Sequence, residues 1–174
     1  MENLFAQGTA VDIPAVLENR DRRVATQARL LTPGVGAVVA AKLNIPGPVK
    51  NNATIEDFFT RQLAAFEDQL LAAGVSFLVA KEWLPAATGP ERFYQLFAPA
   101  PAVKALTTSF EESRPFRRLF DLDVLTRQGD QVVGLSRADA NQPARTCLVC
   151  GRPAKECGRS RRHSVAERPG RSAS

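Results

Sequence analysis

The sequence lacks a long apolar run and a positively charged start. No segment of its 174 residues approaches the roughly 18 to 20 uncharged apolar residues that a membrane helix requires. Glu2 stands where a secretory signal peptide would carry positive charge. These absences exclude a membrane-spanning helix and argue against export, so we expect a cytoplasmic protein without a membrane partner.

Cysteine and histidine are also scarce. The three cysteines, an odd number, all fall within residues 147–157, and the chain has one histidine. In a chain for which we expect no export, this clustering argues against a disulfide framework. The remaining possibilities for the three cysteines are reduced thiols or a metal site.

A net positive charge is absent outside the C-terminal part of the chain. The net charge is +5, but residues 145–174 contain eight Arg or Lys against two Glu, which leaves the rest of the chain at −1. A basic segment suits an anionic partner, which could be nucleic acid, a polyphosphate ligand or an acidic protein, and charge alone does not choose among them. A solvated, partly disordered tail is the alternative.

Apolar side chains are present in sufficient number for one hydrophobic core. The chain is 44% hydrophobic, and 174 residues are too few for two substantial cores. We expect an α+β catalytic domain over residues 1–140, a Cys/His-rich segment over 141–165 that packs on it, and a disordered tail over 166–174.

Apolar periodicity predicts the order of helices and strands. After an N-terminal helix over 13–31, we expect a strand over 35–45, a helix over 54–74, strands over 75–83 and 92–97, a helix around 103–110, and a hairpin of strands over 118–125 and 131–136. The core order βαββαββ is the split βαβ arrangement of ferredoxin-like folds with one extra strand. In that arrangement two helices cover one face of an antiparallel sheet.

Both long helices carry local signals. The apolar stripe of the first helix consists of Ile13, Leu17, Val24, Ala28 and Leu31. Arg20, Arg23 and Gln27 lie beside this stripe, either in water or reaching toward a ligand. Thr54, with Asp57 at the third helical position, forms a variant of the capping box and predicts the start of the second long helix.

Two aspartates alternate with apolar residues in the expected strand around Phe120. Strand periodicity puts Asp121 and Asp123 on one face. Neighbouring carboxylates repel unless a cation lies between them, and Mg²⁺ prefers one or two carboxylates together with phosphate oxygens. The alternative is a half-exposed strand whose polar face carries Asp twice beside Arg117 and Arg118.

A stiff loop follows the first expected strand. Pro46 and Pro48 fix φ on either side of the permissive Gly47, so the loop could present backbone amides and the Lys50 ammonium to phosphate. It is not a Walker A loop, which requires GxxxxGK[ST]. The alternative is a simple turn with a solvated lysine.

The cysteines have a spacing that suits a metal. Cys147, Cys150, Cys157 and His163 offer three thiolates and one imidazole, the number and type that close a tetrahedral zinc site. Four protein ligands leave no open position, so such a site would be structural rather than catalytic. Three free cysteines are the alternative.

Together these motifs resemble the citrate lyase holo-acyl-carrier-protein synthase family, also called apo-citrate lyase phosphoribosyl-dephospho-CoA transferase. The resemblance covers nearly the whole chain and rests on residues 19–23, 46–50 and 118–124, and on 145–150 continuing through Cys157 to His163. Arg117 departs from the family pattern, which has glycine before the matching arginine.

The resemblance implies a nucleotidyltransferase-type enzyme. It would move phosphoribosyl-dephospho-CoA from 2'-(5''-triphosphoribosyl)-3'-dephospho-CoA to a serine of the apo-acyl-carrier subunit of citrate lyase, and release pyrophosphate. Asp121 and Asp123 would be the catalytic residues and Mg²⁺ ligands. Lys50, Gly47 and Arg118, with Arg20 or Arg23, would contact phosphate. The basic tail would then steer the acidic carrier.

Two rival functions use the same motifs. A zinc-anchored nucleic-acid-binding module would explain the cysteines and the Arg-rich run over 159–162, but that run lacks interleaved aromatic residues. A glycosyltransferase would explain the Asp-x-Asp pattern, but no nucleotide-binding α/β half is recognisable. We therefore do not expect nucleic acid as a partner.

Overall fold

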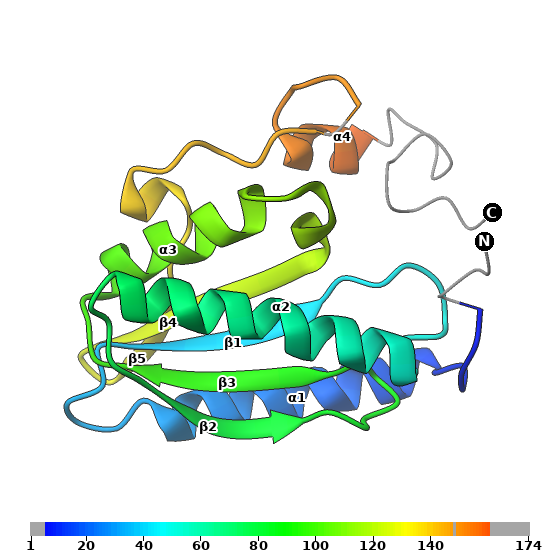
Figure 1. The fold of residues 1–174 in the computed structure, drawn as a ribbon, viewed down its shortest axis with the longest axis horizontal. Coiled ribbons are helices and arrows are strands. Elements are labelled where there is room, and N and C mark those ends of the chain that lie inside the picture. Colours follow the sequence, from blue (N-terminus) through cyan, green and yellow to red (C-terminus); the bar gives the residue numbers. More distant parts are fainter. Residues whose placement is uncertain (1–5, 148, 161–174) are drawn as a thin grey trace.

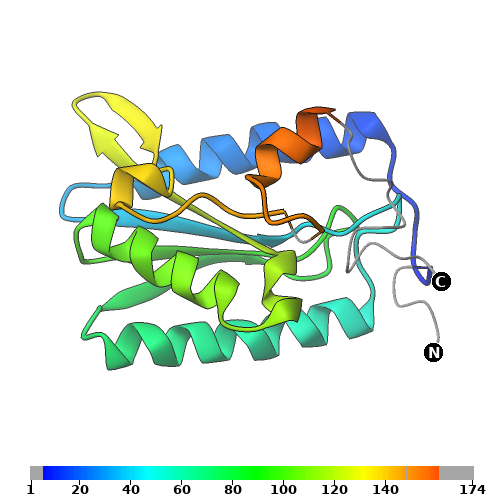
Figure 2. The same cartoon turned by 90° about the horizontal axis from the view of Figure 1, so that it is seen from above.

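The computed structural model describes residues 6–147 and 149–160 (Figures 1 and 2). The main elements are α1 (Ile13–Leu30), β1 (Ala37–Leu43), α2 (Ala53–Ala72), β2 (Phe77–Trp83), β3 (Glu91–Leu96), α3 (Ala100–Glu112), β4 (Phe120–Gln128), β5 (Gln131–Gly134) and α4 (Ala154–Ser160). Two 3₁₀ helices, η1 (Pro115–Leu119) and η2 (Ala138–Ala140), lie before and after the last two strands. None of the helices in the described ranges combines the length and apolarity needed to cross a membrane. The expected tail over 166–174 lies outside the described residues.

The five strands form one antiparallel sheet in the order β2-β3-β1-β4-β5. Helices α2 and α3 cover one face, and α1 lies across the other (Figure 2). The predicted α+β class is therefore confirmed. β1 occupies the centre of the sheet, with β3 and β4 as its neighbours, so these three strands can bring side chains from distant parts of the sequence to one place.

The hydrophobic core lies between the sheet and the pair α2 and α3. One face of β1 and one stripe of α2 supply Ala37, Val39, Ala41, Phe59, Leu63, Phe66 and Leu70. The ring of Phe110 on α3 lies 5.3 Å from that of Phe66 and 5.4 Å from that of Phe120. Because Phe120, Leu122 and Val124 point into this core, strand alternation turns the residues between them toward α1.

Helix α1 is present where periodicity predicts it, but the expected orientation is wrong. Ile13 is 75% exposed and Val24 is 57% exposed, whereas Asn19, Thr26 and Gln27 are buried. The sheet face beneath α1 carries charged groups, so polar side chains of the helix are the ones that find partners there. The amphipathic pattern located the helix and misidentified its inner face.

The start of α2 also differs from the prediction. The N-cap is Asn52, whose side chain accepts a hydrogen bond from the backbone N–H of Ile55 at 2.8 Å. Thr54 lies inside the first turn and is exposed. Asparagine is as good a cap as threonine or better, and a cap at Asn52 starts the helix two residues earlier than a cap at Thr54.

Gly36, just before β1, is predicted to tolerate no side chain. A Cβ at this position would lie 2.0 Å from the carbonyl oxygen of Ala98, which is backbone and cannot move aside. We expect Gly36→Ala to lower the free energy of unfolding by about 3 kcal/mol. Gly134→Ala is the matched control, because a Cβ there meets nothing within 4 Å. Denaturant unfolding of both variants measures the difference, and equal stabilities would contradict the close approach.

Candidate active site

A row of charged residues crosses the three central strands on the face that α1 covers. Lys42 of β1 is paired in register with Glu91 of β3 on one side and with Asp121 of β4 on the other. The Lys42 ammonium forms an ion pair with Asp121, and its Nζ lies 4.0 Å from Oδ2 of Asp123. The predicted common face of the two aspartates is thus confirmed, and a lysine lies between them and Glu91.

Helix α1 closes over one end of this row. The Glu91 side chain, only 3% exposed, forms an ion pair with Arg23 and accepts a hydrogen bond from Asn19 Nδ2 at 2.8 Å. Asn19 in turn accepts a hydrogen bond from Arg22 at 2.7 Å, and the Arg22 guanidinium lies 4.3 Å from the centre of the Trp83 ring. A buried carboxylate needs such partners to remain charged, which explains the polar inner face of α1.

The two aspartates differ in their electrostatic surroundings. Burial works against the charged form of Asp121, but the charge and hydrogen bond of Lys42, aided by Arg145, hold the pKa of Asp121 below its ordinary value. Burial and the nearby Asp121 charge raise the pKa of Asp123, and Lys42 only partly offsets this. One carboxylate is therefore fixed in its ionised form, while the other binds a proton more readily.

A polar cavity of about 190 Å³ opens beside the row. Its lining includes three cationic side chains, Arg23, Lys42 and Lys50, together with Asn19 and Glu91. Three cations around one hollow are suited to an anionic ligand such as a polyphosphate.

Of the predicted phosphate-binding residues in α1 and in the proline–glycine loop, two line the polar cavity and two do not. Arg23 and Lys50 line the cavity, and the Lys50 ammonium donates a hydrogen bond to the carbonyl oxygen of Ile45 at 2.6 Å. Arg20 is exposed on α1 and is not among the residues that line the cavity. Gly47 has φ of +81°, a conformation that glycine adopts without strain. The backbone conformation of the loop therefore explains why glycine stands at this position. Their roles toward phosphate stay predictions.

Arg118 connects the row to the C-terminal segment. It lies in η1, so the strand begins at Phe120 rather than at Arg118 as predicted. Its Nη2 donates to the carbonyl oxygen of Thr146 at 2.7 Å, and its Nη1 lies 3.9 Å from Glu112. Arg118 thus holds the strand that follows η1 against the segment that carries the cysteines. Direct contact of Arg118 with phosphate stays a prediction.

Arg117 points toward the helices α2 and α3. Its Nε donates to Gln62 at 3.0 Å, and its guanidinium lies 4.6 Å from the centre of the Phe110 ring. These contacts account for an arginine at a position where the resemblance led us to expect glycine, because the side chain lies over the core helices. Arg117 therefore contacts the helix side of the sheet.

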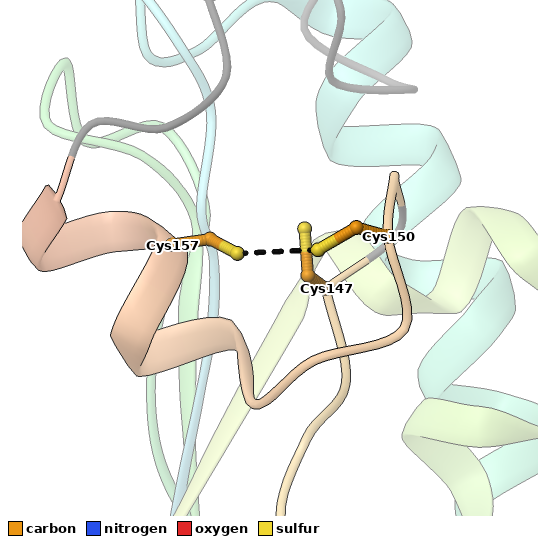
Figure 3. Close-up of side chains that lie close together, drawn as sticks. All are labelled: Cys147, Cys150 and Cys157. Atoms are coloured by element: carbon orange, nitrogen blue, oxygen red, sulfur yellow. Dashed lines mark hydrogen bonds between the residues drawn. The ribbon is translucent and has the colours of Figure 1, made fainter.

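The three cysteines come together at the start of α4. Their sulfur atoms lie within 4.8 Å of one another, and Cys150 Sγ is 3.4 Å from Cys157 Sγ (Figure 3). The backbone N–H groups of Val149 and Cys150 lower the pKa of the Cys147 thiol to about 7. His163, the predicted fourth ligand, lies outside the described residues.

Sequence reasoning did not identify Lys42, Asn19 and Glu91 as site residues. One signal was available for the lysine, because Lys42 is the only charged residue in the apolar run over 35–45 and so needs a partner. The partners could not be identified from local pattern. They lie 79 residues away for Lys42 and Asp121, and 72 residues away for Asn19 and Glu91.

The carboxylates of the aspartate pair are of the ligand type that binds magnesium. The side chains of Asp121 and Asp123 are 41% and 47% exposed, and the Lys42 ammonium faces the Oδ2 atom of each, so a magnesium ion would be held by the remaining carboxylate oxygens. Mg²⁺ is commonly held by one or two carboxylates together with phosphate oxygens and water. The cavity lined by Arg23 and Lys50 would supply the place for such a phosphate.

Comparisons with known proteins identify the family of the chain. A model of the apo-citrate lyase phosphoribosyl-dephospho-CoA transferase family matches residues 11–169. Relatives bearing that name are 37% identical over 158 residues in Citrobacter koseri, covering 91% of this chain and 84% of the relative, and 35% identical over 164 residues in Escherichia coli O1:K1 / APEC, covering 94% and 87%. Protein CitXG of Haemophilus influenzae is 35% identical over 164 residues, which cover 92% of this chain and 34% of that longer protein. The chain therefore belongs to the apo-citrate lyase phosphoribosyl-dephospho-CoA transferase family and is a transferase of citrate lyase maturation.

Proposed function

We propose that this protein transfers phosphoribosyl-dephospho-CoA from its triphosphoribosyl precursor to a serine of the apo-acyl-carrier subunit of citrate lyase, with release of pyrophosphate. The observation that carries the proposal is the row of Lys42, Asp121 and Asp123 beside a cavity lined by Arg23 and Lys50. This arrangement combines carboxylates with the cations that a triphosphate requires.

The two aspartates take different roles in this proposal. The serine oxygen attacks the phosphorus next to the ribose, the new O–P bond forms, and the bond from that phosphorus to pyrophosphate breaks. Asp123, whose pKa is raised by burial and by Asp121, accepts the serine proton. Asp121, kept ionised by Lys42, maintains the charge of the site. Environments that push the pKa values of two carboxyl groups apart commonly divide such roles.

Magnesium, when bound by Asp121 and Asp123, would neutralise charge on the triphosphate and on the leaving pyrophosphate. Arg23, Lys42 and Lys50 would bind the remaining phosphate oxygens and orient the donor. Positioning and electrostatic stabilisation carry most of the catalysis in phosphoryl transfer.

A second hollow suits the rest of the donor. It has a volume of about 430 Å³, and its lining includes Phe58, Phe116 and Leu119. It shares Leu43 and Ile45 with the polar cavity. A coenzyme-A-like donor has a charged end and a long, less polar arm, so we place the arm in this hollow.

The carrier is the proposed macromolecular partner. Residues 145–174 carry the net positive charge of the chain, and an acidic carrier would be steered toward them. The nucleic-acid-binding alternative is not favoured by the family membership.

We also propose that the core is of the ferredoxin-like, split βαβ type. In support, β1 lies between β3 and β4. Helix α2 follows β1, and helix α3 follows β3, the strand next to β1 in the sheet. Helix α1 and β5 would be additions to that core.

A single incubation tests the proposed reaction. Apo-carrier subunit, Mg²⁺, the triphosphoribosyl-dephospho-CoA precursor and this protein are combined, and the intact mass of the carrier is measured. We expect the carrier to gain one phosphoribosyl-dephospho-CoA group, and pyrophosphate to appear in equal amount. An unchanged carrier mass, with the purified protein folded, would refute the proposed function.

A further inference from the structure

The cysteine cluster lies outside the proposed reaction site and has the dimensions of a metal centre. Zinc binds thiolate sulfur at about 2.3 Å in a tetrahedral site, which places pairs of sulfur atoms about 3.8 Å apart. Cys147, Cys150 and Cys157 have all their sulfur atoms within 4.8 Å of one another, and all three are free thiols. Three sulfurs at this spacing surround a common centre, whereas a disulfide would use two and leave the third without a role.

The backbone around Cys147 has the form of a metal-binding turn. The N–H of Val149 points at Cys147 Sγ, 3.4 Å away, and the N–H of Gly151 donates to the carbonyl oxygen of Cys147 at 3.0 Å. An isolated β-bridge between Thr146 and Pro153 closes the loop. N–H groups directed at a sulfur stabilise negative charge on it, and a thiolate is the form that binds metal.

We propose that Cys147, Cys150 and Cys157 bind a structural zinc ion. His163, the fourth ligand predicted from the sequence, lies outside the described residues, so the proposal rests on the three cysteines. Sites rich in thiolate ligands are typical of structural zinc. Its role is to hold the C-terminal segment, and it takes no part in the transfer reaction.

The segment that zinc would hold lies against the strand that carries the aspartates. Arg145 Nη2 lies 3.0 Å from the buried Glu111 carboxylate and 3.4 Å from the carbonyl oxygen of Phe120. Arg118 donates to Thr146, one residue before the first cysteine. These contacts are made by a stretch with no regular element between η2 and α4, so a metal centre at its end would keep Arg145 in place.

Metal analysis of the purified full-length chain tests the proposal. The protein is produced in zinc-supplemented medium, kept reduced, freed of loosely bound metal, and its zinc content is measured. We expect about one zinc per chain, bound as a tetrahedral site. Replacement by Co²⁺ should give thiolate-to-cobalt charge-transfer bands and the d–d bands of a tetrahedral site.

Variants identify the ligands. Cys147→Ser and Cys150→Ser are expected to lose most of the zinc, whereas Lys155→Ala, a variant at an exposed residue of the same segment, should retain it. Zinc removal by a chelator should lower the Tm of the wild-type chain and speed proteolysis near residue 145. A zinc-free wild-type protein would overturn the proposal, whether its cysteines are free thiols or show the loss of two hydrogen atoms that marks a disulfide. Full zinc content in both cysteine variants would overturn it as well.

Discussion

Asp121→Asn and Asp123→Asn are each expected to reduce the rate of carrier modification by about 100-fold or more. Removing one electrostatic group that acts on the transition state typically costs a factor of 10² to 10³. Both side chains are nearly half exposed, and exposed ion pairs contribute about 1 kcal/mol or less to folding. The loss should therefore appear in kcat with little change in Tm.

Asp130→Asn is the matched control for these variants. Asp130 is exposed in the turn between β4 and β5, on the same hairpin but away from Lys42. Its activity should equal that of the wild-type chain. Near-normal activity in both Asp121→Asn and Asp123→Asn would remove the aspartate pair from the mechanism, while leaving the family membership intact.

Lys42→Met is expected to have an effect of similar size, about 100-fold on kcat/KM. Lys42 contacts both aspartates and also lines the polar cavity. Without the ammonium, the two carboxylates repel each other and the cavity loses one of three cations. Steady-state kinetics with the carrier and the donor measure the change.

The pH dependence of Lys42→Met provides an independent check. Burial favours the protonated form of Asp121, and Lys42 offsets this and lowers the pKa of the carboxyl. Removing the lysine therefore raises that pKa, so the ionised pair exists only at higher pH. The acid limb of kcat/KM should shift to higher pH. Lys81→Met, an exposed lysine of β2, should leave both the rate and the limb unchanged, and an unshifted limb in Lys42→Met would contradict the pairing.

Local periodicity was sufficient to predict most helices and strands and to place the two aspartates on one face of a strand. Alternation around Phe120 put Asp121 and Asp123 on one face because a strand permits no other arrangement. The same periodicity located β1, α2 and the β4–β5 hairpin to within a few residues. These features depend only on near neighbours in the chain.

The inner face of α1 could not be predicted in this way. An apolar stripe normally faces a core, but the sheet beneath α1 presents Lys42 and Glu91, so Asn19 and Arg23 turn inward. The orientation of the helix is decided by the charges of β1 and β3, which are known only once the strands are paired. Lys42 was not predicted as a site residue for the same reason, because its partner Asp121 becomes known only once the strands are paired.

The charged row has a consequence for how the enzyme acquires activity during folding. Lys42 and Asp121 are 79 residues apart, and Arg23 and Glu91 are 68 apart. Contacts of such long sequence separation form slowly, because loop closure must precede them. A chain that has been synthesised only through β3 contains the lysine without its aspartates, so it has no catalytic carboxylates. Recovery of transfer activity on refolding should therefore report completed strand pairing, later than the formation of the helices.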